Sequence, residues 1–221
     1  NNGNILKLIP TEENIVKNQF INNISLNEKN LFFLNSFGSL YSINLKSLEL
    51  NWFINLKQNL DSNASNLFSG SQIVNKDDKI IISSNESSYI IDSNNGSVLD
   101  KKNFSNKIKP IIYNNYVFSL TKNNFLICSD INNGKILYSY EINQLISNFL
   151  KSSKKSIIVK SFLIMNNNIY IFLANSYILK LKINGDIIQI KKLPKEINSL
   201  PIIINKSLIF INKKNRVVVV D

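Results

Sequence analysis

The sequence predicts an all-β protein built from repeated antiparallel sheets, and three observations support this. First, helix-favouring residues are scarce: alanine occurs only at positions 64 and 174 and arginine only at 216, whereas Asn and Ile contribute 39 and 37 of the 221 residues. Second, short Asn- and Gly-containing turns separate pairs of apolar segments. Third, turn positions 47, 96, 134 and 185 lie 49, 38 and 51 residues apart. That spacing is typical of one four-stranded blade of a β-propeller.

The blades follow one another in chain order within a single propeller domain, residues 1–221. Each full repeat contains four apolar segments of about five residues, the usual strand length. The expected blades span about 20–56, 71–104, 110–142, 161–193 and 200–221 plus 4–9. Three of the turns contain Asn-Gly pairs, which accept positive φ at both central residues: Asn95-Gly96, Asn133-Gly134 and Asn184-Gly185. The polar stretch 57–70 is expected to be a surface loop.

The two ends of the sequence resemble two parts of one blade. Residues 217–221 match a third strand up to its terminal Asp, and residues 1–6 match the following turn and fourth strand. We therefore expect the segment 4–9 to complete the last blade, which closes a five-bladed ring or joins two chains by exchange. The alternative is that the chain is a fragment of a larger ring.

One segment departs from the β pattern. In residues 142–151 the apolar side chains at 142, 145, 146, 149 and 150 have helical spacing, and lysines follow. One interpretation is a helix that covers one end of the propeller. The other is an exposed docking segment for a partner protein, for which the candidate residues are Leu145, Phe149, Lys151, Lys154 and Lys155. The loop after Trp52 is a second candidate.

Composition excludes several kinds of chemistry. With no His and a single Cys, histidine-based catalysis, zinc sites and intramolecular disulfides are excluded. No apolar run approaches the length of about 18 residues that a membrane span needs. The net charge of +11 is almost entirely Lys and is scattered, whereas nucleic-acid readers favour Arg. We therefore expect no nucleic-acid partner. A propeller that binds polyanions is the hypothesis that the sequence supports least.

The repeats resemble the pyrroloquinoline-quinone-like (PQQ-like) propeller family. Its blades carry the pattern Gly-x-Leu-Tyr-Ala-Leu-Asp-x-x-Thr-Gly-x-x-x-Trp. The first repeat matches this pattern at Gly38, Leu40, Tyr41, Ile43, Asn44, Ser47 and Trp52. The second and third repeats keep the Asp and the turn Gly, and the fourth keeps mainly Asn184-Gly185. The resemblance covers nearly the whole chain, and its motifs indicate the fold and not a particular function.

The resemblance implies two branches with different functions. Quinoprotein dehydrogenases bind the quinone and Ca²⁺ on the propeller axis, often between a Trp and a vicinal disulfide. This sequence has no Cys-Cys pair, its one Trp lies at the structural repeat position, and its acidic pairs Asp77-Asp78 and Glu12-Glu13 lie in a turn and a connection. The other branch is similar to BamB, a lipoprotein scaffold of outer-membrane β-barrel assembly.

The second branch fits the sequence better and sets the functional expectations. We expect a non-enzymatic, periplasmic protein-binding scaffold with no catalytic, cofactor-binding or metal-binding residues. The partner that the resemblance implies is the central subunit of the barrel-assembly machinery. Association with the outer membrane would depend on a lipid anchor that this sequence does not contain. The alternative is a divergent PQQ-dependent dehydrogenase or another ligand-binding propeller.

Overall fold

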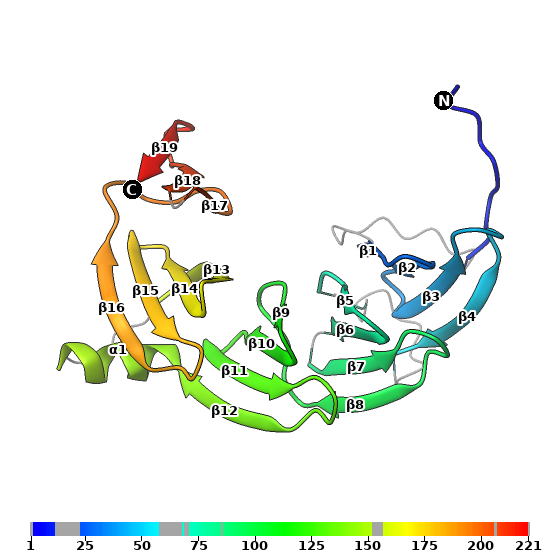
Figure 1. The fold of residues 1–221 in the computed structure, drawn as a ribbon, viewed down its shortest axis with the longest axis horizontal. Helices are drawn as coiled ribbons and strands as arrows, with labels where there is room; N and C mark the ends of the chain where they lie inside the picture. Colours follow the sequence, from blue (N-terminus) through cyan, green and yellow to red (C-terminus); the bar gives the residue numbers. More distant parts are fainter. Residues whose placement is uncertain are drawn as a thin grey trace. The chain divides into compact units, whose positions relative to one another are not determined.

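The computed structural model describes residues 2–11, 23–57, 68, 71–84, 86–151, 157–205 and 207–220. Within these ranges it contains nineteen strands and one helix, arranged in separate antiparallel sheets (Figure 1). The predicted all-β class and its four-stranded blades are confirmed. The chain divides into two compact units, residues 1–117 with 130–135, and residues 118–129 with 136–221.

The first unit contains two complete sheets. The strands of each sheet are neighbours in chain order, so every connection is a hairpin. The first sheet consists of β1 (Asn23–Leu26), β2 (Asn30–Leu34), β3 (Ser39–Asn44) and β4 (Leu50–Asn55). The second consists of β5 (Val74–Lys76), β6 (Lys79–Ser83), β7 (Ser88–Asp92) and β8 (Val98–Lys102).

The remaining sheets follow the same hairpin order. The third, whose residues are divided between the two units, consists of β9 (Ile111–Tyr113), β10 (Tyr116–Leu120), β11 (Phe125–Asp130) and β12 (Ile136–Glu141). Helix α1 (Ile142–Leu150) comes next. The fourth sheet consists of β13 (Val159–Met165), β14 (Asn168–Leu173), β15 (Tyr177–Lys182) and β16 (Ile187–Lys192). The last consists of β17 (Ile202–Ile204), β18 (Ser207–Ile211) and β19 (Val217–Val220).

A β-bulge recurs where the third and fourth strands of a sheet pair. The register shifts between Ser42 and Ile43, and it shifts at the corresponding points of β7, β11 and β15. This regularity allows residues of different sheets to be matched one to one: Trp52 lies opposite Ser42, and Gln189 lies opposite Lys180. The bulge increases the local twist of the paired strands.

The turn after the third strand explains the Asp/Asn and Gly of the repeat. The Asp92 side chain accepts a hydrogen bond from the Asn94 backbone N–H (2.7 Å), and its carbonyl accepts one from Gly96 (2.9 Å). Gly96 has a φ of 77°, whereas the φ of Asn95 is not positive. The expectation of positive φ at both positions is therefore wrong here, and it is also wrong at Asn133-Gly134 and Asn184-Gly185, where only the glycine has positive φ. The connection contains more residues than a two-residue hairpin loop, so only its last turn residue needs the left-handed conformation.

Side chains of the fourth strand pack on the turn of the following sheet. Trp52 covers Gly96, and its indole N–H donates to the Ser93 carbonyl (3.1 Å). Asp100 lies over Gly134 in the same way within the first unit, and Tyr140 lies over Gly185 in the second. Each turn glycine thus has a second role, because a Cβ would collide with the neighbouring side chain. Buried apolar residues between the first two sheets, including Phe32 and Ile80, form the core of the first unit.

Two segments differ from the sequence expectation. Residues 4–9 form no strand, although Gly3 has the positive φ of a turn glycine, and Ile5, Leu6 and Leu8 are exposed. A strand needs a hydrogen-bonded neighbour, and β19 pairs only with β18 among the described residues. In the segment 57–70, expected to be only a surface loop, Phe68 is buried against Gly38. The rest of that segment beyond residue 57 lies outside the described residues.

Tyr138 of β12 provides a test of the contacts in the second unit. Its hydroxyl donates to the Ile183 carbonyl (2.5 Å), and burial, with a smaller contribution from Cys128, raises the pKa of Tyr138 above its ordinary value. We expect Tyr138→Phe to lower the free energy of unfolding by about 1–2 kcal/mol at neutral pH, because the carbonyl loses its donor.

The same substitution has a defined pH dependence. The unfolded tyrosine loses its proton above a pH of about 10, while the folded one keeps it, so wild-type stability falls there and the phenylalanine variant lacks this loss. Urea unfolding of both proteins at about pH 8 and about pH 11 should show the difference between them shrinking. A constant difference would contradict the assignment of the raised pKa.

Candidate protein-docking surface

Helix α1 is an insertion between the third and fourth sheets, and one residue contacts both of its flanks. The Ile142 backbone N–H donates to the Asn124 carbonyl (2.9 Å). The Asn124 side-chain amide donates to the carbonyl of Ile157 (2.9 Å), just before β13. Asn124 lies in the turn between β10 and β11 with φ of 59°. The inserted segment is therefore tied to the sheet at its start and at its end.

The apolar spacing of this segment produces the predicted helix, but its two halves differ in burial. Ile142 and Ile146, one turn apart, are buried. Leu145 is half-buried, whereas Phe149 and Leu150 in the last turn are 47% and 53% exposed. The first half thus packs on the unit as the covering interpretation requires, and the second half is exposed as a docking segment requires.

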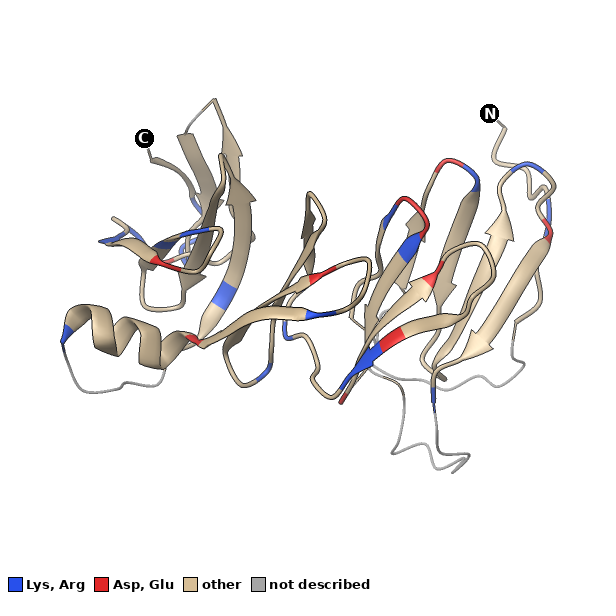
Figure 2. Cartoon of the chain, turned by 60° about the horizontal axis from the view of Figure 1, so that its bottom comes forward, with Lys and Arg blue, Asp and Glu red and all other residues tan. Residues whose placement is uncertain are grey.

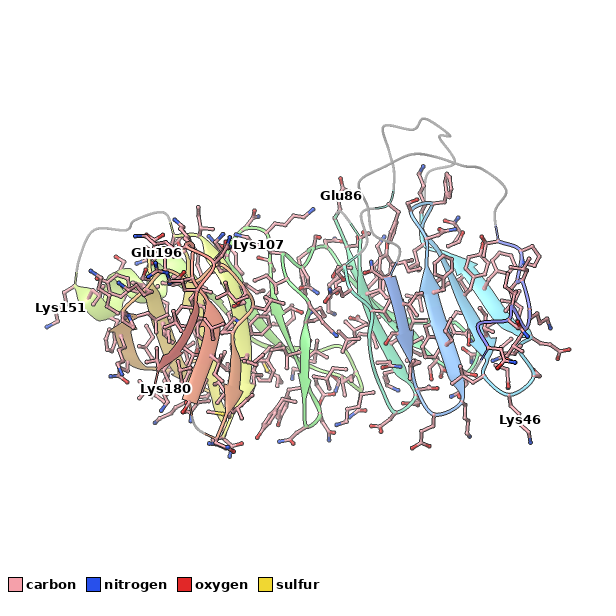
Figure 3. The ribbon with its side chains drawn as sticks, turned by 90° about the horizontal axis from the view of Figure 1, so that it is seen from above. Lys46, Glu86, Lys107, Lys151, Lys180 and Glu196 are labelled. Carbon is pink, nitrogen blue, oxygen red and sulfur yellow. The ribbon has the colours of Figure 1, made fainter. Side chains whose placement is uncertain are left out.

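The structure brings three of the five predicted site residues onto this helix. Leu145 and Phe149 lie one turn apart, and Lys151 is the left-handed C-cap, whose N–H contacts the carbonyls of Asn148 and Ser147. Lys154 and Lys155 lie outside the described residues. We call Leu145, Phe149, Leu150 and Lys151 the α1 surface. Figure 3 shows Lys151 at the end of α1, pointing away from the strands of its unit.

Leu150 is the member of the α1 surface that sequence reasoning left out of the site. The helical spacing already included it, but the spacing does not show which apolar residues remain uncovered.

The amide of Gln144 donates to the side chain of Asn148 (2.7 Å), so an intrahelical hydrogen bond stabilises the exposed polar face. The lysine ammonium group at the C-cap interacts favourably with the helix dipole.

The other described basic residues are spread over each unit. Figure 2 shows Lys and Arg spread over the turns and strands of each unit, interspersed with Asp and Glu. Lys102 pairs with Asp100 (2.9 Å) and Lys79 with Asp78 (3.1 Å). Scattered lysines of this kind are solvated surface charges.

The structure places most of the few residues that bear on the dehydrogenase branch. Trp52 is half-buried and packs on the turn at Gly96. Asp77 and Asp78 lie in the β5–β6 turn, and Glu12-Glu13 lies outside the described residues. Cys128 is a buried free thiol. Within the described part of the chain, no three His, Cys, Asp or Glu side chains come together as a metal site.

The described helix is also too short and too polar to cross a membrane.

Repeated four-stranded antiparallel sheets, each with a bulge where its third and fourth strands pair, give the chain the blades of a β-propeller fold. No family model matches the sequence, and no curated protein matches it. Solved structures of other proteins do resemble the fold. One is BamB from Moraxella catarrhalis, with a TM-score of 0.67 and 12% identity over 96% of this chain and 61% of that chain.

Two other structures are a designed protein and an enzyme. The computationally designed Ika8 protein has a TM-score of 0.64 and 11% identity over 89% of this chain and 56% of that chain. Quinohemoprotein alcohol dehydrogenase from Comamonas testosteroni has a TM-score of 0.63 and 9% identity over 90% of this chain and 41% of that chain. These likenesses establish the fold, and the chain spans less than two thirds of each of these proteins.

Proposed function

We propose that this chain is part of a non-enzymatic protein-binding scaffold whose α1 surface contacts a partner. The observation that carries the proposal is the exposure of Phe149 and Leu150 on a helix whose first turn is buried and hydrogen-bonded to the sheet. A rigidly held apolar pair loses little conformational entropy on binding. Aromatic and aliphatic side chains of this kind provide most of the affinity in many interfaces.

The partner class follows from the resemblance to BamB-like propellers. The fold is similar to that of BamB, and the repeats carry the corresponding blade motif. We therefore propose the central subunit of the outer-membrane β-barrel assembly machinery as the partner and the periplasm as the compartment. Lys151 at the edge of the α1 surface would favour an acidic rim on that partner.

A binding experiment with purified proteins tests this proposal. We expect the chain to bind the central subunit, and we expect the double variant Phe149→Ser/Leu150→Ser to bind at least about tenfold more weakly, because two interface apolar side chains are lost. Leu137→Ser is the matched control, since Leu137 is also 47% exposed but lies on β12 outside the α1 surface. Equal binding by both variants, or no binding by the wild-type chain, would reject the proposal.

The dehydrogenase alternative predicts a different result. The similarity to a quinohemoprotein dehydrogenase is the observation in its favour. If the chain binds the quinone and Ca²⁺, both together must raise its melting temperature, since a ligand of the folded state stabilises that state. On the scaffold proposal we expect no change at saturating concentrations of either.

A further inference from the structure

A cavity of about 330 Å³ lies between the fourth and last sheets of the second unit. Its lining combines apolar side chains with two lysines and a glutamine: Met165, Tyr170, Phe172, Ile178, Lys180, Gln189, Lys191, Leu193, Ile203, Leu208 and Val220. All of these residues belong to the second unit, so the cavity is formed within one compact body. Its volume lies within the range of small-molecule sites, about 300–1,000 Å³.

The floor of the cavity is part of the hydrophobic core. Phe172, Leu193 and Leu208 are buried, and Ile178, Ile203 and Val220 pack against the same cluster. These side chains come from five different strands and a connection, so their positions are set by the sheets. Such a floor favours an apolar group and excludes water from it.

The mouth of the cavity is polar at two positions where another blade is apolar. The strand registers match Lys180 and Gln189 of the fourth sheet to Ser42 and Trp52 of the first, and Lys191 to Ile54. In the first sheet Trp52 and Ile54 pack against the core, with Trp52 6.2 Å from the Phe32 ring. Gln189 is smaller than the matching Trp52, and this difference leaves part of the corresponding space open.

The lysines at this mouth have no carboxylate beside them among the described residues that line the cavity. In the second sheet the residues that match Gln189 and Lys191 are Asp100 and Lys102, which form an ion pair. The cavity lining contains two lysines and no carboxylate. Lys180 lies over the Tyr170 ring at 5.6 Å and is labelled in Figure 3, and neither Lys180 nor Lys191 forms an ion pair with any described residue.

We propose that this cavity is a binding site for a small aliphatic carboxylate. The hydrocarbon part occupies the apolar floor, and the carboxylate lies at the mouth between Lys180 and Lys191, where Gln189 donates a hydrogen bond. Hydrogen bonds between an ammonium group and a carboxylate are stronger than those between neutral groups. This inference does not depend on the proposed scaffold function, because it uses no residue of α1.

Binding is measured with octanoate as the probe and the methyl group of Met165 as the reporter. Met165 lines the cavity and is the single methionine of the chain, so methyl labelling gives one assigned NMR signal. We expect this signal to shift in a saturable manner. Across hexanoate, octanoate and decanoate, the affinity should rise about fourfold for each methylene that the floor buries. Octanol, which lacks the charge, should bind more weakly than octanoate.

Charge variants identify the residues that hold the carboxylate. We expect Lys180→Gln/Lys191→Gln to weaken octanoate binding at least about tenfold, because two charged contacts are lost. Lys192→Gln is the matched control, since Lys192 is the next residue of β16 and points to the opposite face. Unchanged melting temperatures of these variants would show that folding is retained.

A filling variant makes the test independent of charge. Gln189→Trp introduces the residue that the first blade has at the matching position, Trp52. The larger side chain should fill the cavity, so octanoate should no longer shift the Met165 signal. The proposal is overturned if octanoate leaves the Met165 signal unchanged, or if its affinity is the same in the double lysine variant as in the Lys192→Gln control.

Discussion

Replacing Phe32 with alanine is expected to lower the free energy of unfolding by about 3–5 kcal/mol, a large part of the total stability of a typical domain. Phe32 is 0% exposed on β2 and belongs to the core between the first two sheets. Hydrogen-bonded strands surround the site and cannot move inward to fill the space. The lost transfer energy and the remaining cavity therefore add together.

The measurement for Phe32→Ala uses a natural reporter. Trp52 is the only tryptophan of the chain and lies beside Phe32, so its fluorescence follows unfolding of this core in urea. Phe53→Ala is the control: Phe53 is 59% exposed on β4 and stacks on Tyr41. We expect the control to cost about 1 kcal/mol, the value of one aromatic pair. Equal costs for the two variants would contradict the assignment of Phe32 to the core.

Gly96→Ala is expected to be the second most damaging of the substitutions, at about 2–4 kcal/mol. Two effects combine. The residue has φ of 77°, which an alanine adopts at a cost of about 1–2 kcal/mol. In addition, a Cβ at this position would lie 2.6 Å from Cε3 of Trp52, whose own hydrogen bond to Ser93 limits its movement.

Two controls separate these effects. Gly3→Ala has a similar φ of 70° but nothing within 4 Å of the new Cβ, so it measures the backbone cost alone. In a Trp52→Leu background the collision is relieved, and Gly96→Ala should then cost no more than Gly3→Ala. If Gly96→Ala costs the same in both backgrounds, the packing of Trp52 on this turn is not the cause.

Much of the fold follows from information local in the chain. The β runs between Asn- and Asp-containing turns became strands, because turn residues determine where a hairpin reverses. The helix at 142–150 followed from the spacing of five apolar residues. The structural role of Trp52 and the turn glycines followed from the repeat itself.

Features that depend on neighbours distant in sequence were predicted less well. Residues 4–9 have the composition of a strand but no hydrogen-bonded partner among the described residues. Phe68 lies in a polar stretch, yet it is buried because the missing side chain of Gly38 leaves space for its ring. The spacing of α1 indicated an apolar face and could not show that the sheet covers Ile146 but leaves Phe149 exposed.

The order of residues along this chain therefore defines a β-propeller of repeated hairpins, because strands, turns and one helix depend on short-range patterns of apolar residues, Asn and Gly. The packing of the folded chain defines its candidate surfaces. Lys180, Gln189 and Lys191 meet only through the pairing of β15 with β16, and they border a cavity only because the last sheet faces them. Register and burial arise from contacts between distant segments, which no local pattern specifies.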